Sequence, residues 1–206
     1  MGERSLTVPV TESLRRIRQT SGVPLAFAGM VEGNARVTLD HFVGNATGSL
    51  DGLAVEVGHG LGGKVLHHNR PMAVNDYLET PQITHRYNDA IATEGIRGIA
   101  AAPVIVDSRM VAVLYGALRC DTKIDGRLLD VLTAQARNLE QEIAVSRALV
   151  EADARLAPEA DALFRAKVPA DLAEIMGGHG QSWSEAFGPR AEQYFQTWHL
   201  ARYVEH

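Results

Sequence analysis

A glycine-rich segment is the first stretch of the sequence whose residue types and spacing suggest chemistry. Gly58, Gly60 and Gly63 have the spacing G-x-G-x-x-G, and residues 58–64 match most of a phosphate-binding loop, G-x-x-x-x-G-K. A nucleotide-binding loop of that kind needs Ser or Thr after its lysine, and this chain has Val65. A dinucleotide-binding loop needs a parallel βαβ unit, whereas antiparallel hairpins dominate the pattern here. We therefore interpret the segment as the glycine-rich start of a helix.

The histidines raise the question of a metal or heme site. Four of the eight, His59, His67, His68 and His85, lie in one part of the chain. His67 and His68 are adjacent, so on a helix they point in different directions and cannot chelate one ion together. His85 alone is a possible axial heme ligand, although a lone histidine near a pocket is more often a hydrogen-bonding residue. We expect no metal and no cofactor, and keep a heme-based sensor as a minor alternative.

Nucleophilic catalysis has little support in the sequence. There is no G-x-S-x-G motif, and Cys120 is predicted at the end of a strand with no histidine near it in sequence. Because Cys120 is the single cysteine, an intrachain disulfide and a zinc site built from cysteines are both excluded. We expect no catalytic residues, and a protein that is not an enzyme.

Composition and charge limit the compartment and the partners. The 206-residue chain has a net charge of −5, which argues against non-specific binding to nucleic acid. Its longest apolar run, 99–106, contains Pro103 and is far short of the roughly 20 residues that span a bilayer. No apolar stretch of signal-peptide length follows the N-terminal arginines. The sequence predicts a cytoplasmic protein that does not cross a membrane.

The elements that must position these residues follow from hydrophobic periodicity and turn signals. The sequence predicts an amphipathic helix at 11–20 and a further helix at 61–68. Strands are predicted at 23–31, 35–43, 53–57, 72–74, 96–106 and 110–118. A long polar connection runs from 77 to 95 and is predicted to be helical at 83–93. Two hairpins separated by mixed structure favour one antiparallel sheet with helices on its faces. The expected fold class is α+β.

A long helix is predicted after the sheet. Between Gly126 and about residue 154 there is no Gly or Pro, and apolar residues recur at steps of three and four. This heptad pattern fits a helix packed on its own domain or a two-chain coiled coil. Pro158 is expected to end the helix. The predicted organisation is a domain at 1–125, a signalling and dimerisation helix at 126–156, and a helical extension at 157–206. The last helix of this extension, near 190–204, has an apolar stripe that is suited to core packing or to docking another protein.

Four blocks of sequence resemble a known family. In chain order they are GHGLGGKV at 58–65, RPMAVND at 70–76, EGIRGIAAAPV at 94–104 and VAVLYG at 111–116. Their order and spacing together resemble the GAF domain family over residues 11 to about 125. The resemblance implies an antiparallel sheet of five or six strands, with terminal helices on one face and a small-molecule pocket on the other.

The resemblance also suggests site residues. The pocket would lie under the segment from Asp76 to Gly95, where Tyr77, His85 and Tyr87 offer aromatic walls and polar tips. On the central strands, Phe27 and Tyr115 would form the floor. The six candidate ligand-binding residues are Phe27, Asp76, Tyr77, His85, Tyr87 and Tyr115. For all of them except Asp76, ordinary core packing is the alternative.

The ligand itself stays unidentified. Bilin-binding members resemble one another in a cysteine in the helical pocket wall, and Cys120 follows the last strand instead. Members that reduce free methionine sulfoxide use several cysteines. The Asn-Lys-Phe-Asp-Glu set of cyclic-nucleotide-binding members cannot be traced here.

The end of the sheet and the long helix suggest an output. Residues 111–119 followed by that helix resemble the sensory half of actinobacterial GAF-containing transcriptional regulators. Residues 159–206 do not match a helix-turn-helix, so we do not expect direct DNA binding. The first hypothesis is a small-molecule-sensing regulatory protein whose pocket acts on a homodimer through residues 126–156. The alternative is a non-catalytic interaction module with a vestigial pocket and a protein partner at its C-terminal helix.

Overall fold

The structure, a computed structural model, describes residues 4–33 and 36–167. Within them the central element is a six-stranded antiparallel sheet in the order β3-β2-β1-β6-β5-β4. The strands are β1 (Leu25–Glu32), β2 (Arg36–Val43), β3 (Ala54–Glu56), β4 (Met72–Val74), β5 (Gly98–Val106) and β6 (Arg109–Leu118). The helices are α1 (Arg4–Ser21), α2 (Gly60–His68), α3 (Asn88–Thr93) and α4 (Gly126–Lys167). The prediction of an α+β fold with helices on both faces of an antiparallel sheet is confirmed.

The two predicted hairpins form the middle of this sheet. β5 and β6 are joined by Asp107 and Ser108, whose φ angles are 52° and 62°. Two successive positive φ values define a type I′ turn, whose twist matches that of the strands it joins. The β1–β2 hairpin pairs with β6, so residues from both hairpins lie side by side at the centre of the sheet.

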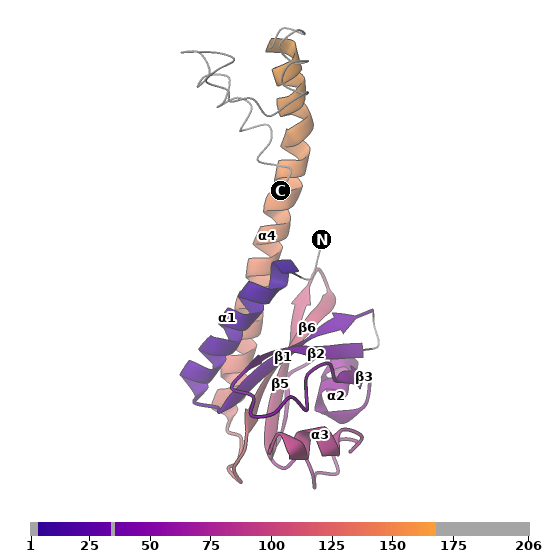
Figure 1. Cartoon of the computed structure of the whole chain (residues 1–206), viewed down its shortest axis with the longest axis vertical. Helices are drawn as coiled ribbons and strands as arrows, with labels where there is room; N and C mark the ends of the chain where they lie inside the picture. Colours follow the sequence, from indigo (N-terminus) through magenta and orange to yellow (C-terminus); the bar gives the residue numbers. More distant parts are fainter. Residues whose placement is uncertain (1–3, 34–35, 168–206) are drawn as a thin grey trace. The chain divides into compact units, whose positions relative to one another are not determined.

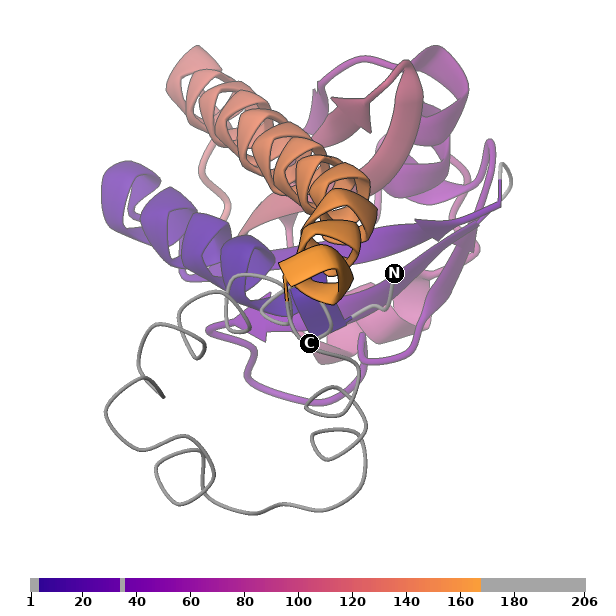
Figure 2. The same cartoon turned by 90° about the horizontal axis from the view of Figure 1, so that it is seen from above.

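Alternation along the central strands divides the core between the two faces. In β1, Leu25 and Phe27 belong to one buried cluster, while Ala26 and Ala28 belong to the other. The second cluster also holds Ala100 and Ala102 of β5, so small residues dominate the sheet surface under α1 and the beginning of α4. Figures 1 and 2 show α1 and this part of α4 side by side.

The first cluster faces α2, α3 and the connections around them, which Figure 1 shows on the other side of the sheet from α1. The sheet side of this cluster is made of larger residues, including Phe27 and Tyr115. This face contains the candidate site.

The chain separates into two units by its internal contacts, Met1–Ala144 and Val145–His206. The beginning of α4 belongs to the first unit, where Leu128, Leu132, Ala136, Leu139 and Ile143 are buried. The predicted heptad pattern is therefore used, up to Ile143, by the domain itself.

Two helix boundaries differ from those predicted. α1 begins at Arg4 and includes Pro9, because Val10 continues the buried stripe of Leu14 and Ile17 and anchors an earlier turn. The prediction that Pro158 ends the long helix was wrong, since α4 continues to Lys167. A proline removes one backbone hydrogen bond at a cost of about 3 kcal/mol, and the strong helix formers Ala, Leu, Glu and Arg around it favour continuation of the helix.

The predicted loop at 177–180 and the helix at 190–204 lie outside the described residues. None of the helices in the described part of the chain combines the length and apolar character that spanning a membrane requires.

Candidate ligand-binding site

A small cavity lies between the sheet and the layer formed by α2 and α3. Its volume is about 20 Å³, and a site for one water needs roughly 10–15 Å³. The residues that line it are Phe27, Leu39, Leu53, Val55, Leu61, Gly62, Tyr77, Tyr87, Ile91, Ile99 and Tyr115. The structure thus brings together four of the six predicted site residues around one cavity.

The floor of the cavity is an aromatic stack on adjacent strands. Phe27 of β1 and Tyr115 of β6 are partners in the strand register. Their ring centroids lie 4.5 Å apart with an interplanar angle of 2°, and Phe42 continues the stack 6.0 Å from Phe27. Because the backbone pairing fixes the two strands, this floor is rigid.

The wall opposite the floor comes from the segment 76–95, here called the wall segment. Its Tyr87 hydroxyl accepts a hydrogen bond of 2.9 Å from the backbone N–H of Glu56, the last residue of β3. Its Tyr77 side chain is buried over the first turn of α2, where a backbone hydrogen bond from Leu61 reaches its hydroxyl. Both tyrosine hydroxyls therefore accept from the backbone.

The glycines of the first turn of α2 make room for these hydroxyls. A β-carbon at Gly60 would lie 2.6 Å from the Tyr77 hydroxyl oxygen. A β-carbon at Gly62 would overlap the Tyr115 hydroxyl, and one at Gly63 would overlap the carbonyl oxygen of Glu56. Gly60, Gly62 and Gly63 accordingly serve close packing at the start of a helix, whereas Gly58 meets open space and has a φ of 79°.

The Tyr115 hydroxyl is buried without a partner. The residue is 4% exposed, and its Oη has no hydrogen-bond partner among the described residues. Burial raises the pKa of Tyr77 to about 12, with a further contribution from Tyr87. Burial, with Tyr77 and Tyr87, raises the pKa of Tyr115 further still. Tyr77 and Tyr115 are therefore neutral phenols near pH 7.

Two predicted site residues lie outside the cavity. Asp76 uses its side chain to accept a 3.1 Å hydrogen bond from the backbone N–H of Leu78, which shapes the turn that begins the wall segment. His85 is exposed, with its Nδ1 atom 3.3 Å from the side-chain oxygen of Asn88. The heme alternative depended on His85, and this histidine does not face the cavity. Within the described ranges, no group of three or more His, Cys, Asp or Glu residues is placed to hold a metal ion.

Sequence reasoning missed the polar contacts that hold the wall segment in place. The Thr84 hydroxyl accepts a 3.0 Å hydrogen bond from the N–H of Gly60, and the Arg86 guanidinium pairs with the Glu56 carboxylate at 2.5 Å. Both contacts join residues more than twenty positions apart. No local pattern indicates such pairs.

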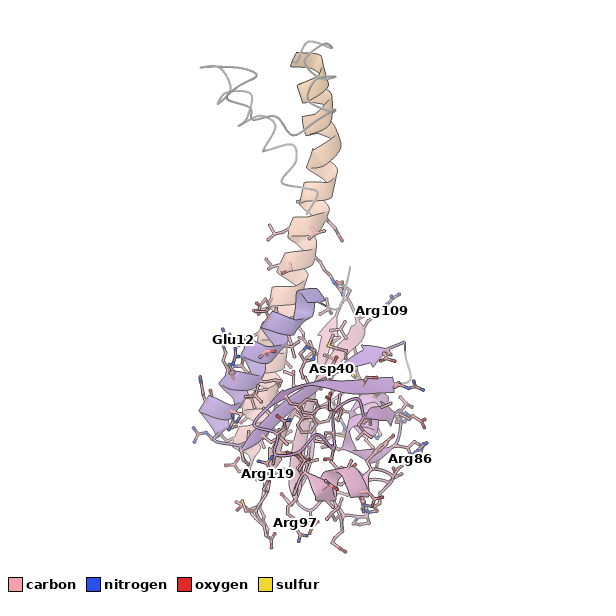
Figure 3. All side chains as sticks on the ribbon, in the orientation of Figure 1. Glu12, Asp40, Arg86, Arg97, Arg109 and Arg119 are labelled. Carbon is pink, nitrogen blue, oxygen red and sulfur yellow. The ribbon has the colours of Figure 1, made fainter. Side chains whose placement is uncertain are left out.

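A buried carboxylate fastens the other end of the wall segment. Glu94 is 2% exposed and accepts hydrogen bonds from the N–H of Ala46 (2.5 Å), from the N–H and hydroxyl of Thr47 (2.9 and 2.6 Å), and from Arg119 (2.5 Å). Arg119, labelled in Figure 3, also donates to the carbonyl oxygens of Glu94 and Gly44. Burial by itself acts to raise the pKa of Glu94, but the hydrogen bonds from Thr47, Ala46 and Arg119 outweigh it and lower the pKa below its ordinary value. Glu94 is therefore a buried anion.

One hydrogen bond connects the wall segment with the start of α4. Asn75, the residue before the segment, accepts a 2.8 Å hydrogen bond through Oδ1 from the backbone N–H of Ile124. Asp125 follows and caps α4 by accepting from the N–H of Leu128 at 3.2 Å. The wall segment thus begins one residue after Asn75, and α4 begins two residues after Ile124.

Comparisons with known proteins agree with this architecture. The transcriptional activator RamA of Corynebacterium glutamicum is 32% identical to the chain over 140 residues, which are 68% of this chain and 50% of that protein. The chain therefore spans about half the length of this curated relative. The predicted likeness to an actinobacterial transcriptional regulator is confirmed at this level.

Solved structures share the fold at low sequence identity. The GAF domain of a phosphoenolpyruvate-protein phosphotransferase from Coxiella burnetii has a TM-score of 0.57 and 19% identity, over 69% of this chain and 84% of that one. A free methionine-R-sulfoxide reductase from Neisseria meningitidis, solved with its substrate, has a TM-score of 0.57 and 17% identity, over 70% and 81%. The first is one domain of an enzyme and the second is an enzyme, and at these identities the two likenesses show the fold alone.

The family follows from the match along the sequence. A family model described as a GAF domain matches residues 3–144, which coincide closely with the first unit of the structure. The match covers well over half of the chain and includes both central hairpins and the cavity. The chain belongs to the GAF domain family.

Proposed function

We propose that this protein is a cytoplasmic, non-enzymatic regulatory protein that senses a small molecule in the cavity and passes the signal to α4. The observation that carries the proposal is the hydrogen bond between Asn75 and Ile124, because it joins the residue just before the wall segment to the residues that lead into α4. The similarity to RamA supports an output in transcription regulation.

The size of the cavity explains why binding would produce a signal. At about 20 Å³ it has room for little more than one water. A larger ligand must therefore displace one side of it. The sheet side is fixed by the β1–β6 ladder, whereas the wall segment is held mainly by side-chain contacts such as those of Thr84 and Tyr87. Displacement of the wall is the less costly response, and a preference of a few kcal/mol is enough to shift the population.

A homodimer would be the second part of the mechanism. The predicted dimerisation helix was 126–156, but its residues up to Ile143 pack on their own domain. Beyond them, Val145, Leu149 and Val150 are 58%, 61% and 48% exposed. A spacing of four residues places Val145 and Leu149 on one helix face, which suits pairing with the same face of a second copy. We place the dimer contact in α4 after Ile143.

Native mass spectrometry of gently purified protein tests both parts. We expect a dimer that carries a small co-purified molecule, and a monomer for Leu149→Ser, which removes apolar contact area. Ala144→Ser, at an exposed position that is neither three nor four residues from Val145 or Leu149, is the matched control and should stay dimeric. A bare monomer from the native sequence would contradict both the sensing site and the dimer.

Hydrogen exchange tests the coupling itself. Removing the co-purified molecule by repeated dialysis should change the exchange rate of the Ile124 amide, since its acceptor adjoins the wall segment. Exchange at the Leu114 amide, in the middle of β6, serves as the internal reference. An Ile124 rate that is the same with and without bound molecule would show that the cavity does not signal to α4.

A non-catalytic interaction module with a vestigial pocket is the second candidate, and the small cavity favours it. Under that function the protein would bind no small molecule, and Asn75→Ala would not alter its oligomeric state. The proposed protein partner at residues 190–204 stays a prediction, because those residues lie outside the described part of the chain.

A further inference from the structure

The chemical character of the cavity identifies the class of molecule that it would accept. Its lining is apolar and aromatic, with Tyr77, Tyr87 and Tyr115 among the lining residues, and within the described part of the chain it includes no Lys, Arg, His, Asp or Glu. We propose that the cavity binds a small uncharged molecule with an apolar body and an acceptor oxygen of the carbonyl type, and that the Tyr115 hydroxyl donates to that oxygen. This inference rests on the proposed function, since it names the ligand class of the same site.

The three tyrosine hydroxyls can donate hydrogen bonds to a ligand but have little capacity left to accept them. A phenol has one proton to donate and an oxygen that accepts. The Tyr87 oxygen already accepts from the N–H of Glu56, and the Tyr77 oxygen receives a backbone hydrogen bond from Leu61. The Tyr115 hydroxyl has no partner in the described residues. A ligand that brings an acceptor complements this set, whereas one that brings donors competes with the backbone for the same oxygens.

The surroundings disfavour a charged ligand. No cationic residue of the ranges 4–33 and 36–167 lines the cavity. An anion that is buried without a cation loses its hydration with little compensation. Burial is also the main cause of the rise in the pKa of Tyr77 to about 12, because it disfavours the charged phenolate as it would disfavour a charged ligand.

The N-terminus of α2 does not replace the missing cation. The N–H of Gly60 donates to the Thr84 hydroxyl at 3.0 Å, and the N–H of Gly63 donates to the carbonyl oxygen of His59 at 3.0 Å. The Leu61 N–H is directed to Tyr77. Three of the first four N–H groups of α2 are therefore in use, and an anion at this helix N-terminus would find at most the N–H of Gly62.

The apolar lining determines the rest of the ligand. Phe27 and Tyr115 offer a flat stacked surface, and Ile91 and Ile99 contribute branched side chains. The Tyr115 hydroxyl lies tight against Gly62, where a β-carbon would overlap it, so an acceptor atom reaches the hydroxyl only when the side chains around the cavity move apart. A carbonyl oxygen would occupy the volume of about one water, and the attached body would displace the wall segment.

Three probes of nearly the same shape test this class. They are 3-methyl-2-butanone, isobutyramide and isobutyrate, which carry a neutral acceptor, a neutral acceptor with donors, and an anion on the same branched body. Binding to the full chain at pH 7 is measured by ligand-observed NMR in titrations. We expect the ketone to bind most tightly and isobutyrate most weakly. Tyr115→Phe, which keeps the stacked ring, should weaken the ketone roughly tenfold, the loss expected for an unpaired acceptor. Thr133→Val removes a hydroxyl that does not line the cavity and should leave binding unchanged.

The outcomes separate the ligand class from the sensing function. Isobutyrate binding more tightly than the ketone, no binding of the ketone, or equal ketone affinity in Tyr115→Phe would each overturn the proposed class. The exchange rate of the Ile124 amide, recorded on the same samples, reports the function. If isobutyrate binds best and still changes that rate, the class is wrong and sensing stands. If the ketone binds as expected and the rate stays constant, the class stands and sensing is wrong.

Discussion

Replacing Glu94 by glutamine should destabilise the first unit strongly. The carboxylate accepts from four donors, two at each oxygen: Ala46 and Arg119 at Oε1, and the N–H and hydroxyl of Thr47 at Oε2. A glutamine has only one accepting oxygen. In either orientation its NH₂ group faces two donors, so the network cannot be satisfied.

The size of the effect follows from the less costly orientation. With the NH₂ group toward Thr47, the hydroxyl can rotate away but the N–H of Thr47 loses its acceptor, at about 1–3 kcal/mol. The bonds from Ala46 and Arg119 also change from charge-assisted to neutral ones, which are roughly half as strong. Together we expect a loss of about 3 kcal/mol in the free energy of unfolding, or roughly 6–12 °C in Tm for a protein of this size.

The same contacts make the loss depend on pH. The pKa of Glu94 is lowered in the folded protein, so the folded state binds this proton less readily than the unfolded state, where the pKa is about 4.3. The stabilisation is therefore complete above the unfolded pKa and decreases as the pH falls through the folded pKa. The difference in stability between the native protein and Glu94→Gln should accordingly be largest near neutral pH and shrink in acid.

Urea unfolding followed by far-UV circular dichroism, at several pH values, measures this difference. Glu79→Gln is the matched control, because Glu79 is an exposed carboxylate of the same wall segment, and it should change stability by less than about 0.5 kcal/mol. Equal stability of Glu94→Gln and the native protein, or a difference that does not vary with pH, would refute the assignment of Glu94 as a buried anion.

Three further predictions concern the cavity and its connection to α4. Gly62→Ala should lower the free energy of unfolding by about 1–3 kcal/mol through overlap with the Tyr115 hydroxyl; Gly48→Ala, where a β-carbon meets open space, should change it by less than about 0.5 kcal/mol. Asn75→Ala should speed exchange of the Ile124 amide and cost about 0.5–1 kcal/mol, whereas Asn75→Asp keeps an acceptor and should not speed it. Tyr115→Phe should raise the free energy of unfolding of the ligand-free protein by about 1 kcal/mol, measured by urea unfolding, because it removes an unpartnered buried hydroxyl.

The sequence predicted those parts of the fold that depend on local periodicity. The β5–β6 hairpin was predicted from two apolar runs on either side of Asp107 and Ser108. Helix α2 was predicted from its glycine-rich start and from Pro71, which follows its end. The pairing of Phe27 with Tyr115 depends on the order of strands in the sheet. No periodicity reveals that order, and it was the family resemblance that placed both residues on the cavity floor.

The parts that the sequence did not predict depend on direction and on distant partners. His85 and Tyr87 are close in sequence, and only the path of the chain before α3 turns Tyr87 inward and leaves His85 exposed. Glu94 and Thr47 are 47 positions apart, so neither residue type indicates the other. The unpartnered state of the Tyr115 hydroxyl is a property of everything around it, and it cannot be read from the residue itself.

The strongest alternative to a binding site is an ordinary aromatic core, and the two differ in the expected sign of one measurement. In a core formed for stability alone, phenylalanine at position 115 would keep the 4.5 Å stack on Phe27 and avoid burying a polar group. If the Tyr115 hydroxyl serves a ligand, its removal should stabilise the empty protein and weaken binding at the same time. If the hydroxyl instead has a partner in the ligand-free protein, such as a bridging water, Tyr115→Phe should be less stable than the native protein. Opposite changes in stability and affinity from a single oxygen atom would distinguish a binding site from a core, because packing alone cannot produce them.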